Sequence, residues 1–206
     1  MIVTGEVYHV FNKSISEFKI FNSESDFLRI KNVIRYYQIE KQPVKFSEFE
    51  ERKVKNYTFN NKKLVEIICY CLMPTHIHLV VKQLIDLGIS KFMNNILNSY
   101  SRYFNIKHNR KGPLWEGRFK KVLVETDEQL LHLTRYIHLN PTTAYLVDKP
   151  IDWEYSSYKE YISDCNERIC KYEDIIDIKP DAYKTFVEDR ISYQRELAKI
   201  RGLILE

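Results

Sequence analysis

The chain has 206 residues, 44% of them hydrophobic, so it can bury a real core and is not a disordered chain. No apolar run approaches the roughly 18 residues of a membrane span, and the N-terminus lacks a basic segment followed by an apolar one. We therefore expect neither a membrane anchor nor a signal peptide.

The net charge of +4 is unevenly spread along the chain. Residues 145–206 hold ten Lys/Arg and fourteen Asp/Glu, so the positive excess belongs to the first 144 residues. Between Ser101 and Lys121 there is a single acid, Glu116, among seven basic residues. Such a run is either a solvated basic face or a surface for a polyanion. The seven are Arg102, Lys107, Arg110, Lys111, Arg118, Lys120 and Lys121.

The four cysteines lack the spacing of a zinc site. Cys69 and Cys71 lie in the apolar run "IICYCLM", where buried thiols are expected, and Cys165 and Cys170 form the second pair. We expect a reduced, cytoplasmic protein without structural zinc.

The first predicted elements are a strand and a helix. Residues 5–14, "GEVYHVFNKS", alternate apolar side chains and predict a strand. Residues 23–41 have apolar side chains at helical spacing, with Ser23 or Ser25 as the cap. The charged residues 41–63 predict a long connection with room for a short helix.

A hairpin and a long helix follow. Residues 64–73, "LVEIICYCLM", and residues 76–83, "HIHLVVKQ", predict two antiparallel strands joined by a turn at Pro74-Thr75. Residues 88–108 have the apolar spacing of an amphipathic helix.

The last predicted pair is a strand at residues 119–125 and a helix at residues 127–140. Thr126 with Gln129 has the spacing of a capping box at the start of this helix. Pro141 is expected to end it, because the residue before a proline avoids the helical conformation.

This order of elements favours an α+β fold in which a central antiparallel sheet is flanked by helices. A doubly wound parallel sheet would require strands and helices in strict alternation. We interpret residues 1–144 as the functional domain and the acidic residues 145–206 as a C-terminal extension packed on or beside it.

Two histidines open the second hairpin strand, His76 and His78 in "MPTHIHLVV". Because side chains alternate along a strand, both rings share one face while Ile77 points to the other. Two neutral imidazoles at this spacing can hold one divalent cation and leave positions for water or substrate. The pair is also compatible with two ordinary half-buried histidines.

A row of polar side chains follows the flank of the last predicted helix. His132, Tyr136 and Asn140 are four residues apart and therefore lie on one side of it. Tyr136 is a candidate nucleophile toward a phosphorus polarised by a metal, and Asn140 is a candidate third ligand. The ordinary alternatives are a tyrosine that only packs and an Asn-Pro pair that only ends the helix.

Four segments in this order resemble the single-tyrosine HUH transposases of small bacterial insertion sequences, in particular the REP-associated tyrosine transposases: "YHVFNKS", "MPTHIHLVV", "GPLWEGRFK" and "RYIHLNP". The resemblance spans roughly residues 5–153 and implies the HUH endonuclease fold, which is ferredoxin- or RRM-like. It implies Tyr136 as the nucleophile and Mg²⁺ or Mn²⁺ as the cofactor, held by His76, His78 and Asn140. Thr75 departs from the Asn that the family often has before the first histidine.

The resemblance also implies a metal-dependent enzyme that nicks and rejoins single-stranded DNA through a 5′-phosphotyrosine intermediate. The substrate is expected to carry a hairpin, and the protein to be a monomer or a homodimer with exchanged tyrosine helices. Trp115 either stacks on an extruded base or anchors its loop in the core. The residues expected to bind DNA are Arg102, Arg110, Lys111, Trp115, Arg118, Lys120 and Lys121.

Other classes of function fit less well. A histidine-triad hydrolase requires a third histidine at the position of Val80, and a metallo-β-lactamase-type site requires Asp and His at Leu79 and Val80. The alternative left open is a non-catalytic, domesticated module of the same fold that binds single-stranded DNA or RNA hairpins.

Overall fold

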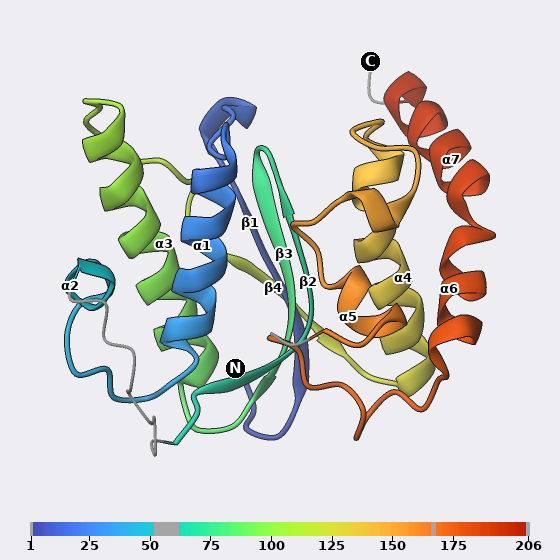
Figure 1. Cartoon of the computed structure of the whole chain (residues 1–206), viewed down its shortest axis with the longest axis horizontal. Helices are drawn as coiled ribbons and strands as arrows, with labels where there is room; N and C mark the ends of the chain where they lie inside the picture. The colour runs from blue at the N-terminus through green and yellow to red at the C-terminus, as the bar shows by residue number, and fades with distance from the viewer. Residues whose placement is uncertain (1, 52–61, 166–167, 205–206) are drawn as a thin grey trace.

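The structure is a computed structural model that describes residues 2–51, 62–165 and 168–204. Its centre is an antiparallel sheet with the strand order β2-β3-β1-β4 (Figure 1). With a long helix between the first two strands and another before the last, this order is the ferredoxin-like arrangement. The predicted α+β fold is confirmed. The strands are β1 Val7–Lys13, β2 Val65–Met73, β3 His76–Gln83 and β4 Lys120–Val124.

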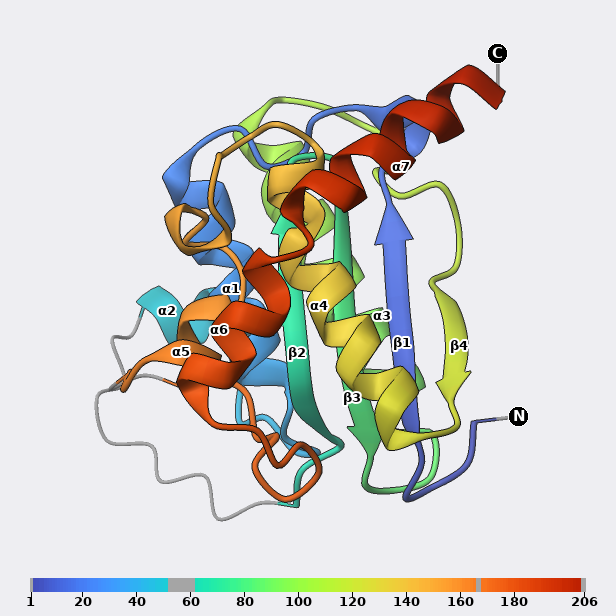
Figure 2. The same cartoon turned by 90° about the vertical axis from the view of Figure 1, so that its right-hand side faces the viewer.

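Helices lie on both sides of the sheet, as Figures 1 and 2 show. α1 (Glu24–Tyr37) and α3 (Gly88–Lys107) pack together on one face, and α4 (Asp127–Thr143) crosses the other. Among the described residues, four short helices lie in the segments between the main elements, and two further helices lie near the C-terminus. They are η1 Ile15–Glu17, α2 Phe46–Glu51, η2 Pro150–Asp152, α5 Tyr158–Ile162, α6 Pro180–Glu188 and α7 Ile191–Ile204.

The start of α1 is fixed by a carboxylate that also joins α1 to α3. Asp26 accepts a hydrogen bond from the Ser23 backbone N–H at 3.1 Å, so Ser23 is the cap. Lys107 pairs with the same carboxylate at 2.7 Å. Burial alone would raise the pKa of Asp26, but the hydrogen bonds from Lys107 and Ser23 bring it below its ordinary value.

The long connection predicted at residues 41–63 contains the expected short helix, α2. Its residues 52–61 lie outside the described part of the chain.

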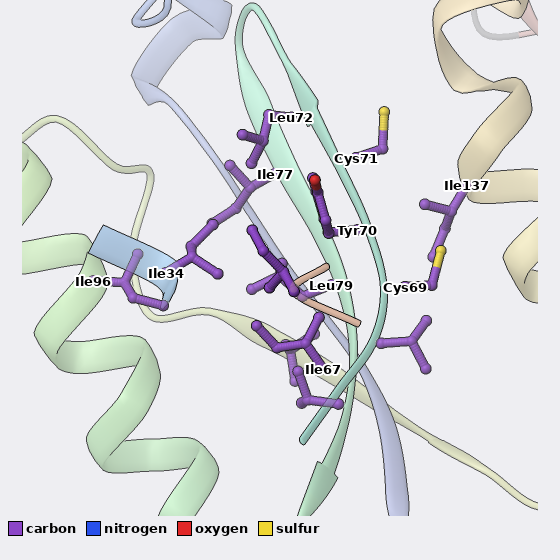
Figure 3. Close-up of a cluster of buried hydrophobic side chains, with 14 of the residues drawn as sticks. Ile34, Ile67, Cys69, Tyr70, Cys71, Leu72, Ile77, Leu79, Ile96 and Ile137 are labelled. Atoms are coloured by element: carbon purple, nitrogen blue, oxygen red, sulfur yellow. The ribbon is translucent and has the colours of Figure 1, made fainter. Parts of the chain in front are cut away.

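Alternation along β2 and β3 gives the two faces of the sheet different contents, as Figure 3 shows. Tyr70 and Leu79 point toward the side of α1 and α3. Cys69 and Cys71 point the other way, toward Ile137 of α4. All four cysteines are free thiols, and Cys69 and Cys71 are buried as predicted. The two thiols of β2 therefore lie on the α4 face of the sheet.

Pro141 does not end the last helix, contrary to the prediction. α4 continues to Thr143, because the proline falls within the last turn and its missing N–H is partly replaced. The side-chain amide of Asn140 donates to the carbonyl oxygens of Tyr136 at 3.0 Å and Ile137 at 3.4 Å. The helix therefore holds residue 140 in regular geometry rather than at a frayed end.

Residues after 145 cover α4 and the outer edge of β2. The backbone N–H of Leu72 donates to Tyr155 at 2.9 Å, and that of Ser157 donates to Tyr70 at 2.9 Å. These bonds satisfy an edge strand that would otherwise be open to pairing with another chain. In the described part of the chain, no helix is long and apolar enough to cross a membrane.

Candidate active site

The two histidines of β3 lie side by side on the α4 face of the sheet. The rings of His76 and His78 are perpendicular, with centroids 5.0 Å apart, and His78 is only 9% exposed. Burial lowers the pKa of His76 to about 4 and that of His78 well below its ordinary value. Both rings are therefore neutral near pH 7, which is the form that binds metals.

Each of these rings has one nitrogen held by the protein. The Nδ1 of His76 lies 2.9 Å from the Thr75 hydroxyl, and the Nδ1 of His78 lies 2.9 Å from Nε2 of His9. No partner is seen for either Nε2 within the described ranges. Metal-binding histidines have this pattern, with one nitrogen fixed by a neighbour and the other available to the ion. The pair fits a divalent cation on these grounds.

A cavity of about 700 Å³ opens beside the histidines. β1, β3 and the segment that leads into β4 form its walls. Both signs of charge are present, with an exposed ion pair of 3.7 Å between Lys13 and Glu116. Besides the two histidines, the polar and charged residues lining the cavity are Asn12, Lys13, Glu17, Thr75, Glu116, Arg118 and Lys120.

Tyr136 lies next to His78. The two rings are nearly perpendicular, at 83°, with centroids 6.3 Å apart. α4 sets this position: Thr126 caps the helix by accepting from the Gln129 N–H at 3.1 Å, and Ile137 is fully buried against the sheet. Tyr136 then falls at the edge of the buried stripe and is 37% exposed. The structure therefore brings the tyrosine and the histidine strand together.

Asn140 lies one turn beyond Tyr136. Its amide nitrogen is bonded to its own helix, and the described residues show no hydrogen bond between Asn140 and His76 or His78. Nor do those ranges contain a group of three or more His, Cys, Asp or Glu arranged to hold a metal ion. Asn140 as the third ligand therefore stays a prediction.

His132, the first member of the polar row, takes no part in this site. Its Nδ1 lies 2.8 Å from Arg135, and its ring packs against Phe186 of α6.

Among the residues predicted to bind DNA, Arg118 and Lys120 are exposed and line the cavity. Lys111 and Lys121 are exposed but do not line it. A backbone that approaches the histidines would thus meet Arg118 and Lys120 first.

Two other arginines of that set have different surroundings. Arg110 fastens its own loop, donating to Asn105 at 3.1 Å and to the carbonyl of Pro113 at 2.8 Å. Arg102 lines a separate depression on α3, which packs on the face of the sheet opposite the histidines.

Trp115 matches the loop-anchor interpretation and not base stacking. Its ring is 8% exposed, and its indole N–H donates to the carbonyl of Leu97 at 3.1 Å. Tyr100 and Phe21 lie against it, with ring centroids 6.3 and 6.5 Å away. A base cannot stack on a ring that is enclosed in this way.

Sequence reasoning missed two residues beside the histidines, His9 and Lys13. Both lie on the α4 face of β1, where Phe11 pairs with His78 and Lys13 with His76. The alternation of β1 placed them on one face, but only the pairing of β1 with β3 shows what they face.

Comparison with known proteins agrees with these features. The chain matches the family model "Transposase IS200 like" over residues 40–140. A curated Haemophilus influenzae protein with the provisional name REP-associated tyrosine transposase is 29% identical over 103 residues. That match covers 45% of this chain and 58% of the relative, less than two thirds of its length.

A solved structure of a REP-associated tyrosine transposase bound to a REP hairpin has a similar fold. The TM-score is 0.57 at 16% identity, over 86% of this chain and 92% of the other. The resemblance to the IS200-like transposases is therefore confirmed. The chain is also similar to the REP-associated tyrosine transposases.

Proposed function

We propose that this chain is a transposase-like enzyme that cuts and rejoins single-stranded DNA with Tyr136 as the nucleophile and a divalent metal as cofactor. The observation that carries the proposal is the position of Tyr136, whose ring lies 6.3 Å from that of His78. Beside it, His76 and His78 both keep Nε2 available at a cavity with basic residues in its wall.

The histidines and Asn140 are the residues that would hold Mg²⁺ or Mn²⁺. Imidazole nitrogen and amide oxygen suit either ion. When bound, the ion would withdraw charge from the scissile phosphate and orient it for in-line attack.

Tyr136 would then exchange one phosphoester for another. A bond forms between its phenol oxygen and phosphorus, and the bond from phosphorus to the 3′ oxygen breaks. The phenol gives up its proton to solvent, and the departing oxygen takes one up to become a free 3′-OH. Because the 5′-phosphotyrosine conserves the ester, a 3′-OH can later attack it and rejoin the strand without external energy.

The proposed substrate is DNA that is single-stranded at the scissile bond. Arg118 and Lys120 would contact its phosphates, since they line the cavity and are exposed. The related structure is bound to a REP hairpin, and we extend hairpin recognition to this chain as part of the proposal. α4 packs on β2 of its own chain, which supports an active site completed within one monomer.

The test is covalent capture. The protein is incubated with Mn²⁺ and single-stranded oligonucleotides copied from the DNA that flanks its gene, hairpins included, and run on a denaturing gel. We expect a protein–DNA adduct that requires Mn²⁺ and disappears in Tyr136→Phe. Tyr193→Phe is the matched control, because Tyr193 is 50% exposed on α7 and packs with Arg190.

Two outcomes would overturn the proposal. An adduct that survives in Tyr136→Phe would assign the nucleophile to another residue. Tight binding of the oligonucleotides without any adduct would favour the non-catalytic hairpin-binding module.

A further inference from the structure

The contact between His9 and His78 joins two strands through their side chains. His9 belongs to β1 and pairs with Val80, so it lies diagonally across from His78 on the α4 face. Nε2 of His9 is 2.9 Å from Nδ1 of His78, and the rings are stacked at 21° with centroids 5.2 Å apart. The Phe11 ring lies against both imidazoles, with its centroid 4.8 Å from that of His9 and 5.9 Å from that of His78.

A hydrogen bond between two neutral imidazoles requires one N–H and one lone pair. If His78 donates from Nδ1, its other nitrogen, Nε2, keeps a lone pair that can bind a metal. If His9 donates from Nε2 instead, the proton of His78 must sit on its own Nε2, and that nitrogen cannot bind a metal. Only the first arrangement is compatible with the proposed function.

We infer that His9 is the positioning residue of the metal site: it accepts a hydrogen bond from Nδ1 of His78 and so keeps the Nε2 lone pair of His78 directed at a divalent cation. The inference rests on the proposed function. His9 acts through His78 and is not itself a ligand, because its Nε2 accepts this hydrogen bond and its Nδ1 then carries the proton. In most metal sites a carboxylate or a backbone carbonyl has this role.

His76 shows why His78 needs such a partner. His76 is held by the Thr75 hydroxyl, which can accept from Nδ1 at 2.9 Å. On the sheet, His78 pairs with Phe11 of β1 on one side and with Cys71 of β2 on the other. Neither offers a strong acceptor, so within the described residues His9 supplies the one recorded hydrogen bond to the His78 ring.

The experiment measures Mn²⁺ binding by titration calorimetry on the full chain without DNA, at about pH 8, where ordinary imidazoles are neutral. His9→Phe keeps an aromatic ring against Phe11 but removes the acceptor. His9→Gln restores an acceptor through its side-chain oxygen. His108→Phe is the matched control, since His108 is an exposed histidine at the end of α3.

Loss of the acceptor should weaken Mn²⁺ binding about 10- to 100-fold in His9→Phe, with a smaller loss in His9→Gln and none in His108→Phe. Adduct formation by His9→Phe should recover at saturating Mn²⁺, because the catalytic groups are unchanged. Equal affinity in wild type and His9→Phe would overturn the inference, as would a His9→Gln variant weaker than His9→Phe.

NMR of ¹⁵N-histidine-labelled wild type with Mg²⁺ gives an answer even if the variants do not fold. The expected result is a proton on Nδ1 of His78 and none on Nε2 of His9; a proton on Nε2 of His78 would contradict it. A wild type that binds no Mn²⁺ contradicts the proposed function. A wild type that binds Mn²⁺ and loses it in His78→Gln, but not in His9→Phe, contradicts this inference alone.

Discussion

Two buried histidines in different regions of the molecule have opposite relations to their surroundings. His138 lies under the C-terminal helices, with Nδ1 2.7 Å from the Tyr183 hydroxyl and Nε2 2.8 Å from that of Ser157. His78 lies on the open part of the sheet, with Nδ1 bonded to His9 and Nε2 facing no protein partner in the described ranges. Burial lowers the pKa of both.

The number of ring nitrogens bonded to protein separates a structural histidine from a candidate metal ligand. At His138 both nitrogens are satisfied by the protein, so the ring ties α4 to the C-terminal residues and has nothing left for a ligand. At His78, the described residues provide a hydrogen bond to Nδ1 alone, and a cavity lies beside the ring. In Figure 2, α6 lies beside α4 and α7 crosses its upper end, whereas β1 and β4 lie on its other side.

The largest effect is expected from His78→Gln, on chemistry rather than on stability. Loss of a metal ligand should reduce Mn²⁺-dependent adduct formation on the order of 10³-fold, since the ion contributes several kcal/mol to such a transition state. The free energy of unfolding without metal should fall by only about 1 kcal/mol, because one hydrogen bond is lost. Single-turnover rates and urea unfolding measure the two; a large loss of stability with normal adduct formation would break the comparison.

His138→Phe should have the reverse effect. It removes both hydrogen bonds and leaves the buried Tyr183 hydroxyl short of a partner, at a cost of about 2 to 3 kcal/mol in the free energy of unfolding. Urea unfolding measures this loss. The folded protein should still bind Mn²⁺ as the wild type does, and a weakened Mn²⁺ affinity would show that the two regions are coupled.

Tyr183→Phe sharpens the same point with a smaller change. It removes the hydroxyl that faces His138 but keeps the fully buried ring, so we expect a loss of about 1.5 kcal/mol. Thermal and urea unfolding of Tyr183→Phe and His138→Phe give two losses in the free energy of unfolding. Their ratio is the share of the His138 effect that comes from the hydrogen bond to Tyr183. If Tyr183→Phe equals the wild type in stability, the hydroxyl does not hold His138.

The smallest effect is expected at the rim of the cavity. Arg118→Gln should weaken single-stranded DNA binding about 3-fold and lower the salt slope by roughly one phosphate contact, without changing Mn²⁺ affinity. Lys121→Gln removes the same charge from β4 outside the cavity and is the control. Fluorescence anisotropy over a range of salt concentrations measures both. Equal losses in the two variants would mean that only net charge matters.

Much of this arrangement was predictable from the sequence, because it rests on local periodicity. The period of two in "HIHLVV" places His76 and His78 on one face, and the four-residue spacing places Tyr136 and Asn140 on one flank of α4. Alternation and helical spacing also gave the strands and helices that form the sheet and its two covers.

What could not be predicted depends on contacts between distant segments. His9 meets His78 because β1 pairs with β3, across 69 residues, and nothing local in "YHVFNKS" specifies that partner or its register. The burial of Trp115 depends likewise on α3. Pro141 does not end the helix because only Thr142 and Thr143 follow it within α4. In addition, the Asn140 side-chain amide donates to the carbonyl of Ile137, which the missing N–H of Pro141 leaves without its helical donor.

We propose that His76 and His78 hold a divalent ion next to Tyr136. A crystal structure of Tyr136→Phe with Mn²⁺ and a single-stranded oligonucleotide would locate this ion through the anomalous signal of the metal. We expect one strong peak within about 2.3 Å of Nε2 of both histidines, with the ring at position 136 beside the phosphate. A peak elsewhere, or none at saturating Mn²⁺ with DNA bound, would contradict it.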